Sequence, residues 1–196
     1  MTAPRILLFA GSLRTGSFNR RLADLAEVCV TAAGGDVDHI SLRDYPMPLY
    51  DGDEDAEHGP PAGATALHAK FAAAQGVFIV SPEYNAGTPP LLKNAIDWVS
   101  RVKGNGGQDS AFVRPVFALA SASPGGLGGY RGLIALRQSL VLQLGATVIP
   151  QMVSVSKAHE AFKDDGTLED ERSAGFLRVL SEKLVRLAGA IEPFAA

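Results

Sequence analysis

A loop rich in hydrogen-bond donors lies near the N-terminus, between an apolar run and a stretch with helical spacing. Residues Gly11–Asn19 read GSLRTGSFN. The N-terminus of a helix presents unpaired N–H groups and a positive dipole end, so a loop of this composition favours binding of a phosphate. Ser12, Ser17 and Asn19 add side-chain donors, and Arg14 adds a charge that can hold a phosphate in a bidentate manner. A helix cap formed by Ser17 is the simpler alternative, although one cap accounts for only part of this set.

Several familiar phosphate sites are excluded by residues that the loop lacks. It contains neither GxGxxG nor GxxxxGK[ST], so it is neither the usual dinucleotide fingerprint nor a nucleoside-triphosphate loop. It contains no cysteine, which excludes a thiolate phosphatase loop. Ser81 stands where a receiver domain needs an aspartate at the end of the third strand. The remaining interpretation is a site for a monophosphate group.

Short apolar runs alternate along the chain with longer stretches of helical spacing. The alternation predicts one doubly wound α/β domain over residues 1–196, with helices on both faces of a five-stranded parallel sheet. Two long polar segments, Asp44–Gly63 and Lys103–Arg114, are expected to be loops. The predicted strands are Ile6–Ala10, Val37–Leu42, Val77–Val80, Val116–Ala120 and Thr147–Val153. The predicted helices are Asn19–Ala33, Ala64–Ala74, Pro90–Val102, Tyr130–Leu144 and Glu169–Ala188.

A flavodoxin-like strand order, 2-1-3-4-5, would bring the ends of strands one, three and four to one edge of the sheet. Ligands of such sheets bind at the carboxyl ends of the strands, near the point where the order reverses. The loops that follow these three strands are Gly11–Asn19, Ser81–Pro90 and Ser121–Gly132. We therefore expect the three loops to form one site.

The second of these loops begins the segment SPEYNAGTPPLLKNAIDW. Its PEYN and LKNAIDW motifs, together with GSLRTGSFN, resemble those of the NADPH-dependent FMN reductase family, which includes flavodoxin-like quinone, chromate and azo-dye reductases. The segments MPLYD (Met47–Asp51) and EAFKDDGTLED (Glu160–Asp170) extend the resemblance over most of the chain. The resemblance implies FMN as the cofactor, NADPH or NADH as the electron donor, and a homodimer or tetramer in which the neighbouring subunit completes each flavin pocket.

The resemblance also implies roles for individual residues. The FMN phosphate would be held by Ser12, Arg14, Ser17, Phe18 (through its backbone N–H) and Asn19. The isoalloxazine ring would lie beside Pro82, Glu83, Tyr84 and Asn85, where backbone N–H groups can face flavin N5 and O4. Ala86 and Gly87 stand where many members carry Tyr-Ser or Gly-Ser, so contacts there would come from the backbone. Tyr84 could instead be a core residue, and Glu83 could instead order its own loop.

The third loop, SASPGGLGGYRG, contains five glycines. Small residues let a flat ring lie against backbone, and the helix that starts near Tyr130 favours partial negative charge at flavin N1 and O2. The family comparison implies that Ser121, Ser123 and Gly125 contact the ring edge. A flexible turn is the alternative that composition leaves open.

Other features favour simpler interpretations. The single cysteine, Cys29, excludes an internal disulfide, is expected to pack rather than to act as a redox thiol, and suits a cytoplasmic protein. The four histidines lack metal-ligand spacing, so we expect no metal site. Trp98 is expected in the core or at a subunit interface. A net charge of −3 argues against nucleic acid, and no apolar run is long enough to span a membrane.

These features predict an NAD(P)H-dependent FMN oxidoreductase that passes electrons to a small-molecule acceptor such as a quinone, an azo compound or free flavin. No catalytic side chain is nominated, because the flavin carries the chemistry. Two alternatives stay open: a flavodoxin-type electron carrier and a flavin-binding protein without turnover. Oxidation of NAD(P)H by the purified protein distinguishes the enzyme from both.

Overall fold

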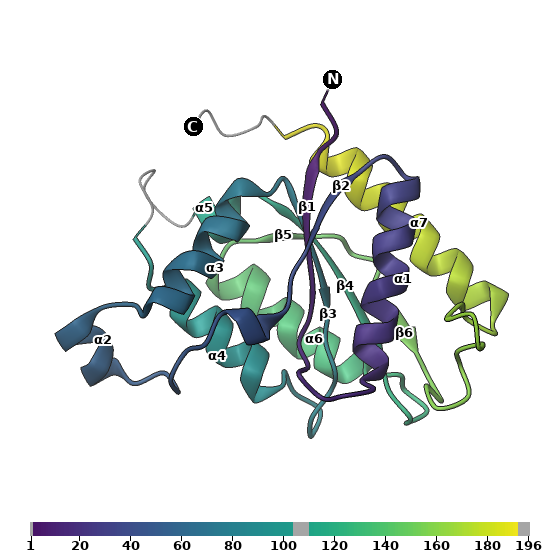
Figure 1. Cartoon of the computed structure of the whole chain (residues 1–196), viewed down its shortest axis with the longest axis horizontal. Helices are drawn as coiled ribbons and strands as arrows, with labels where there is room; N and C mark the ends of the chain where they lie inside the picture. Colours follow the sequence, from purple (N-terminus) through teal and green to yellow (C-terminus); the bar gives the residue numbers. More distant parts are fainter. Residues whose placement is uncertain (1, 104–109, 192–196) are drawn as a thin grey trace.

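A parallel sheet forms the centre of the computed structural model, which describes residues 2–103 and 110–191 (Figure 1). The strand order β2-β1-β3-β4-β5 confirms the flavodoxin-like prediction. All of the strand pairs are parallel, as expected for strands connected by helices. The strands are β1 (Arg5–Ala10), β2 (Asp36–His39), β3 (Gly76–Val80), β4 (Val116–Ala122), β5 (Thr147–Val148) and β6 (Val153–Val155).

The predicted fifth strand, Thr147–Val153, is divided in two, which corrects the sequence-based expectation of one continuous strand. β5 pairs with the beginning of β4, whereas β6 pairs with its end, at Ala120–Ala122. Pro150 lies between the two strands and has no N–H to donate to the sheet, so the ladder is interrupted there. As a result β4 is paired as far as its carboxyl end, where the candidate site lies.

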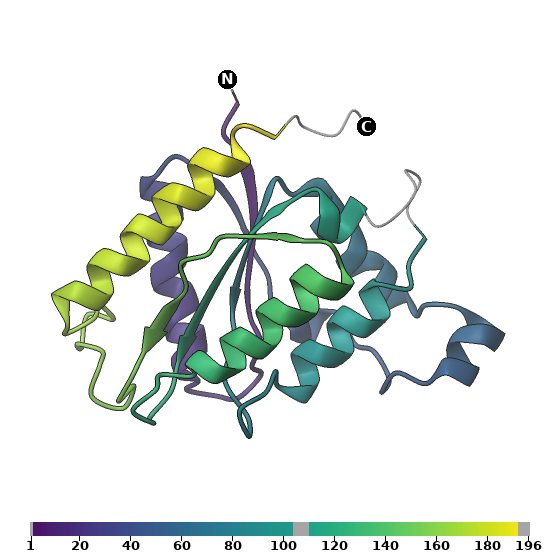
Figure 2. The same ribbon diagram turned by 180° about the vertical axis from the view of Figure 1, so that it is seen from behind.

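Helices cover both faces of the sheet, as predicted. α1 (Phe18–Ala32) and α7 (Glu171–Ala188) lie side by side on one face, and the opposite face carries α3 (Ala62–Ala73), α4 (Pro90–Val99) and α6 (Tyr130–Gln138) (Figures 1 and 2). The chain continues from α6 into a π-helical turn, η2 (Ser139–Gln143). The regular α-helices α4 and α6 end at Val99 and Gln138. Both are therefore shorter than the predicted helices Pro90–Val102 and Tyr130–Leu144.

Alternate residues of the central strands form two separate cores. On β1, Ile6 and Leu8 pack with α1 and α7, while Leu7 and Phe9 pack with the helices of the other face. Both sets are almost completely buried, so the strands read as continuous apolar runs in the sequence. Trp98 belongs to the interior, with 1% of its surface exposed.

The segment Asp44–Gly63, expected to be a loop, contains a helix and begins within a 3-10 turn, η1 (Leu42–Asp44). The helix is α2 (Gly52–His58), which buries none of its residues and stands away from the body in both views (Figures 1 and 2). Asp51 caps it by accepting a hydrogen bond from the N–H of Asp53 at 2.8 Å. A local cap, rather than an apolar stripe, begins this helix, which is why the apolar pattern did not predict it.

The second predicted loop, Lys103–Arg114, lies partly outside the described residues. Its described part includes the short helix α5 (Ser110–Val113). Within residues 2–103 and 110–191, none of the helices combines the length and apolar character needed to cross a membrane.

Candidate functional site

The sheet brings the ends of three strands level with one another. Ala10 of β1 pairs with Val80 of β3, which in turn pairs with Ala120 of β4. The next residues continue the ladder, since the N–H of Gly11 donates to the Val80 carbonyl at 2.9 Å and that of Ser81 donates to the Ala120 carbonyl at 2.8 Å. The three loops therefore leave the sheet from one edge, at the lower side of Figure 1, as the sequence predicted.

The first loop leads into α1 without a side-chain cap. Ser17 is the N-cap residue, yet its hydroxyl makes no capping hydrogen bond, contrary to the simpler interpretation of this serine. The carbonyl of Ser17 accepts the first helical bonds, from the N–H groups of Arg20 and Arg21, at 3.1 Å each. The N–H groups of Phe18 and Asn19 belong to the first turn, where no intrahelical acceptor exists. This arrangement leaves backbone donors and the Ser17 hydroxyl for an anion.

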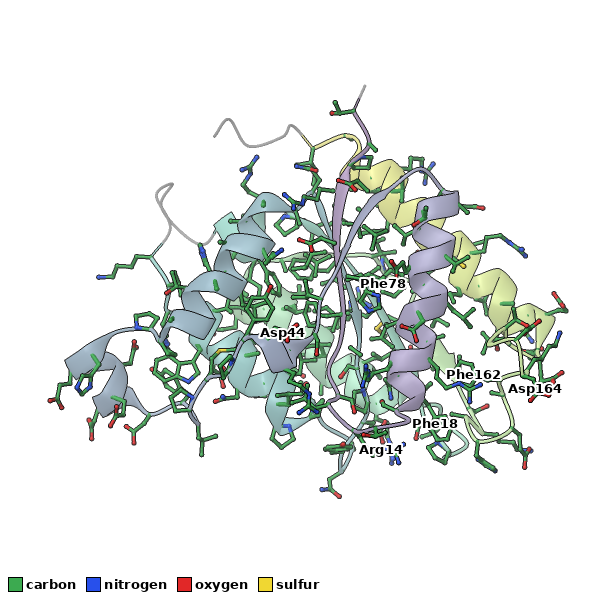
Figure 3. The ribbon with its side chains drawn as sticks, in the orientation of Figure 1. Arg14, Phe18, Asp44, Phe78, Phe162 and Asp164 are labelled. Atoms are coloured by element: carbon green, nitrogen blue, oxygen red, sulfur yellow. The ribbon has the colours of Figure 1, made fainter. Side chains whose placement is uncertain are left out.

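Arg14 lies beside this helix start and is ordered by aromatic contacts. Its guanidinium stands over the Phe18 ring at 5.8 Å from the ring centre. Phe18 in turn stacks on Phe162, with ring centres 6.4 Å apart and planes 10° apart (Figure 3). The guanidinium of Arg21 covers the Phe162 ring at 4.4 Å from its centre. Cation–π contacts of this kind stabilise by about 0.5–1 kcal/mol at exposed sites. The row of four side chains thus places Arg14 beside the start of α1.

Phe162 and its neighbours were missed as site residues by the sequence analysis. They form a small hairpin, in which Phe162 bridges Leu168 and the N–H of Lys163 donates to the Thr167 carbonyl at 2.8 Å. The segment EAFKDDGTLED was noted only for its resemblance to the family. Apolar spacing could not show that this segment, about 140 residues later in the chain, packs against Phe18.

The side chains of Ser12 and Asn19 both make hydrogen bonds within the protein, but Ser12 only accepts one, so its O–H donor stays available to a ligand. The hydroxyl of Ser12 accepts a long hydrogen bond from the N–H of Arg14 at 3.4 Å, and the residue is 8% exposed. The amide of Asn19 is buried and bonds in both directions to the backbone of Ala122 at the end of β4. Asn19 therefore offers a phosphate its backbone N–H, whereas the sequence analysis expected a side-chain donor.

The second loop contains a tight left-handed turn. Tyr84 and Gly87 exchange two backbone hydrogen bonds, at 3.0 and 3.2 Å, around Asn85 and Ala86. The φ angles of these central residues are 51° and 62°, which is the pattern of a type I′ turn. Alanine is strained at such an angle, and strain of this kind collects at functional sites. Tyr84 is half-exposed, so it is not a core residue.

Glu83 holds this turn against α6. Its carboxylate accepts hydrogen bonds from Arg131 Nε–H at 2.9 Å, from Arg131 Nη2–H, and from the N–H of Gly132 at 3.0 Å. Desolvation raises the pKa of Glu83, but the hydrogen bonds and charge of Arg131 and the Gly132 N–H outweigh it and hold the pKa below its usual value. Of the two interpretations of Glu83, the geometry supports the one in which it orders its loop.

The contact between this loop and α6 depends on a glycine. A Cβ at Gly132 would lie 2.9 Å from the Cβ of Glu83 and 3.0 Å from its Cα. The absence of a side chain thus allows the two backbones to approach. Arg131 and Gly132 were not singled out individually in the sequence, although both belong to the glycine-rich loop Ser121–Gly132 that it did indicate.

The third loop places its three predicted residues at different depths. Ser121 is completely buried, and its hydroxyl has no hydrogen-bond partner within the described part of the chain. Gly129 covers it closely, because a Cβ at Gly129 would lie 1.9 Å from the Ser121 Oγ. Ser123 is partly buried and accepts a hydrogen bond from the N–H of Gly125 at 3.4 Å, and Gly125 is exposed. Ser123 and Gly125 are therefore the two that reach the surface.

The assembled edge fits a flavin mononucleotide in its donor chemistry. An uncapped helix start with an adjacent arginine suits a phosphate dianion. The strained turn and the glycine-rich loop beside it present backbone that a flat ring can approach closely. Among residues 2–103 and 110–191, no group of three metal-ligating side chains gathers.

Fold and site together define a flavodoxin-like α/β protein with an uncapped helix start and a basic loop at its strand-order reversal. Comparison with known proteins gives the class more narrowly, since the model of the NADPH-dependent FMN reductase family matches residues 4–160. A quinone reductase of Escherichia coli is 39% identical over 138 residues, which cover 70% of this chain and 69% of that protein. An NAD(P)H-dependent FMN reductase of Pseudomonas aeruginosa is 34% identical over 170 residues, with 86% of each covered.

A solved structure agrees with these relatives. The flavoenzyme NAD(P)H:(acceptor) oxidoreductase of Paracoccus denitrificans superposes with a TM-score of 0.73 at 26% identity, covering 95% of this chain and 97% of that one. The chain belongs to the NADPH-dependent FMN reductase family. The resemblance seen in the sequence motifs is thereby confirmed, together with the class of enzyme and its FMN and NAD(P)H dependence.

Proposed function

We propose that this protein is an NAD(P)H-dependent FMN oxidoreductase that reduces quinones or related small acceptors. The observation that carries the proposal is the single sheet edge that carries both the uncapped start of α1 and the strained turn Tyr84–Gly87. FMN bound there would accept a hydride at N5 from NAD(P)H and release two electrons to the acceptor. The protein's own task is to bind, orient and shield that group.

The phosphate half of the site would act through Arg14, the hydroxyls of Ser12 and Ser17, and the N–H groups of Phe18 and Asn19. Backbone donors at a helix start are fixed in direction, so they need little reorganisation on binding. Arg14 is already oriented by Phe18 and can form a charge-assisted pair with the phosphate.

The ring half would be formed mainly by backbone. The turn at Asn85 and Ala86 is held in place by the Glu83 clamp on α6. Fixed N–H dipoles beside a ring stabilise the negative charge that develops there on reduction. Because Ala86 and Gly87 have little or no side chain, recognition at this place depends on the backbone conformation rather than on residue type.

We also propose a homodimer or tetramer in the cytoplasm, with a second copy closing each pocket. Three large side chains around the site edge stay substantially exposed: Tyr84 at 50%, Leu127 at 55% and Tyr130 at 43%. Aromatic side chains are enriched at subunit interfaces, where burial stabilises them. Light scattering of the purified protein, with and without FMN, tests this part of the proposal.

The function is tested by the visible spectrum of the purified protein before and after anaerobic NADPH, followed by NADPH oxidation with benzoquinone. We expect FMN to bind, to be bleached when NADPH reduces it, and to be reoxidised by the quinone. FMN binding without NADPH oxidation would instead indicate a flavodoxin-type carrier or a flavin-binding protein without turnover. A protein that binds no FMN would refute the proposal.

The Arg14→Ala variant tests the phosphate half separately. Loss of a charge-assisted contact of about 1.5–3 kcal/mol should weaken FMN binding by about tenfold or more. Riboflavin, which lacks the phosphate, should bind both proteins equally. Unchanged FMN affinity would show that the phosphate lies elsewhere.

A further inference from the structure

The side chain of Asn19 ties the phosphate loop to the end of β4, and we propose that it sets the spacing between the two halves of the FMN site. Its Nδ2 donates to the carbonyl of Ala122 at 2.8 Å, and its Oδ1 accepts from the N–H of Ala122 at 3.0 Å. The pair joins residues 103 positions apart, and Asn19 is 4% exposed. The inference rests on the proposed function and assigns Asn19 a positioning role in place of phosphate binding through its side chain.

The amide fills a gap left by β3. β3 ends at Val80, and the last bond from this end of the strand to β4 runs from the N–H of Ser81 to the Ala120 carbonyl. Peptide groups of a strand face its two sides alternately, so those of Ala122 face the same side as those of Ala120. Asn19 therefore pairs with Ala122 where the next residues of a longer β3 would have done so.

Ala122 is held from its other side as well. It pairs with Val155 of β6, and the N–H of Ser123 donates to the Val155 carbonyl at 3.0 Å. The end of β4 is thus a fixed point, and the loop to Ser123 and Gly125 begins there. In the sequence, Asn19 itself follows directly after Ser17 and Phe18 of the phosphate half. One side chain consequently connects the phosphate half to the loop of the ring half.

This connection has a thermodynamic consequence for a ligand that engages both halves. A two-point ligand gains affinity because binding of one end holds the other end near its own subsite, and the gain is greatest when the spacing of the subsites matches the ligand. Loss of the Asn19 link should reduce this gain while leaving each subsite intact. A side chain that contacts the phosphate would instead weaken the phosphate subsite itself.

The experiment measures the affinities of FMN, riboflavin and inorganic phosphate for Asn19→Ala, by flavin fluorescence and by competition. We expect FMN affinity to fall by about tenfold, while riboflavin and phosphate affinities change by less than about twofold. An equal loss for FMN and phosphate would identify Asn19 as a direct ligand and overturn the proposal. Parallel losses for all three, or no loss, would also overturn it.

The chain offers a matched control in Asn94. Its Oδ1 accepts from the Tyr50 N–H at 2.7 Å and its Nδ2 donates to the Pro48 carbonyl at 2.8 Å, so Asn94→Ala removes the same two kinds of bond elsewhere. We expect the ratio of FMN to riboflavin affinity to stay unchanged in Asn94→Ala. A similar fall of the ratio in Asn94→Ala would show that the ratio of FMN to riboflavin affinity depends on stability alone.

Two further measurements keep the proposal testable if Asn19→Ala folds poorly or if the proposed function fails. Asn19→Gln keeps the amide oxygen and nitrogen but adds a methylene. It should therefore lower the ratio of FMN to riboflavin affinity through altered spacing. Hydrogen exchange at the Ala122 amide reports the link without any flavin and should accelerate in both Asn19 variants. Unchanged exchange would refute the link, whereas absence of FMN binding by the wild type would refute the function only.

Discussion

Replacing Glu83 with glutamine should destabilise the fold by about 2 kcal/mol at neutral pH. The carboxylate side chain is 8% exposed and accepts bonds from Arg131 and Gly132, whereas Arg131 is 58% exposed. Hydrogen bonds to charged groups contribute about 1.5–3 kcal/mol, and the exposure of Arg131 places this set near the lower end of that range. Glutamine retains one oxygen for the N–H of Gly132, so the loss falls mainly on the contact with Arg131.

The pH dependence of this difference is a sharper test than its size. The pKa of Glu83 is lowered in the folded state, so the carboxylate stabilises the fold fully above its unfolded pKa of about 4.5. That contribution is lost as the pH falls through the folded value, because the carboxyl group then protonates in both states. The advantage of the wild type over Glu83→Gln should therefore begin to shrink near pH 4.5 and disappear below the lowered folded pKa.

Urea unfolding of both proteins at pH 7 and at a series of acidic pH values measures these differences. The exposed pair Lys93–Asp97, at 2.6 Å, provides a control, and Asp97→Asn should cost less than about 0.5 kcal/mol. A double-mutant cycle with Arg131→Gln isolates the coupling between Glu83 and Arg131. A difference below about 0.5 kcal/mol at pH 7, or one that persists unchanged in acid, would refute the clamp.

Two other substitutions test the geometry of the site edge. Ala86→Gly should raise the free energy of unfolding by about 0.5 kcal/mol, because relief of the strain at a φ of 62° outweighs the added freedom of the unfolded chain; a loss of stability in urea unfolding would contradict the left-handed turn. Phe162→Ala removes the ring on which Phe18 stacks and should speed FMN dissociation by about threefold through a less ordered Arg14. Stopped-flow displacement measures this rate, and an equal effect on riboflavin would argue against a role at the phosphate.

Much of the sheet could be predicted from sequence because its signals are local. The runs at Ile6–Ala10 and Val116–Ala120 are apolar throughout since both faces of these strands are covered, and this pattern is independent of distant residues. The prediction failed where a single residue changed the pairing. Pro150 lies inside an apolar stretch, so composition predicted one strand where hydrogen bonding allows two.

The candidate site could likewise be predicted only where its sequence signal is local. Residues 11–19 reveal their donors directly, so an anion site followed from the sequence. The partners of those residues did not follow, because Asn19 meets Ala122 and Phe18 meets Phe162 only once the sheet is assembled. Spacing along the chain carries no signal for a contact over 103 positions.

These partners change the interpretation of the polar side chains at the site. The two oxygens of Glu83 and both amide atoms of Asn19 bond to the protein itself. The donors left to a ligand are then chiefly backbone N–H groups, with Arg14 and the hydroxyls of Ser12 and Ser17 beside them. Backbone donors are retained when neighbouring side chains change, so Ala86 and Gly87 in the turn are compatible with the proposed ring site. The polar side chains at this edge thus act mainly by fixing the backbone that a ligand would contact.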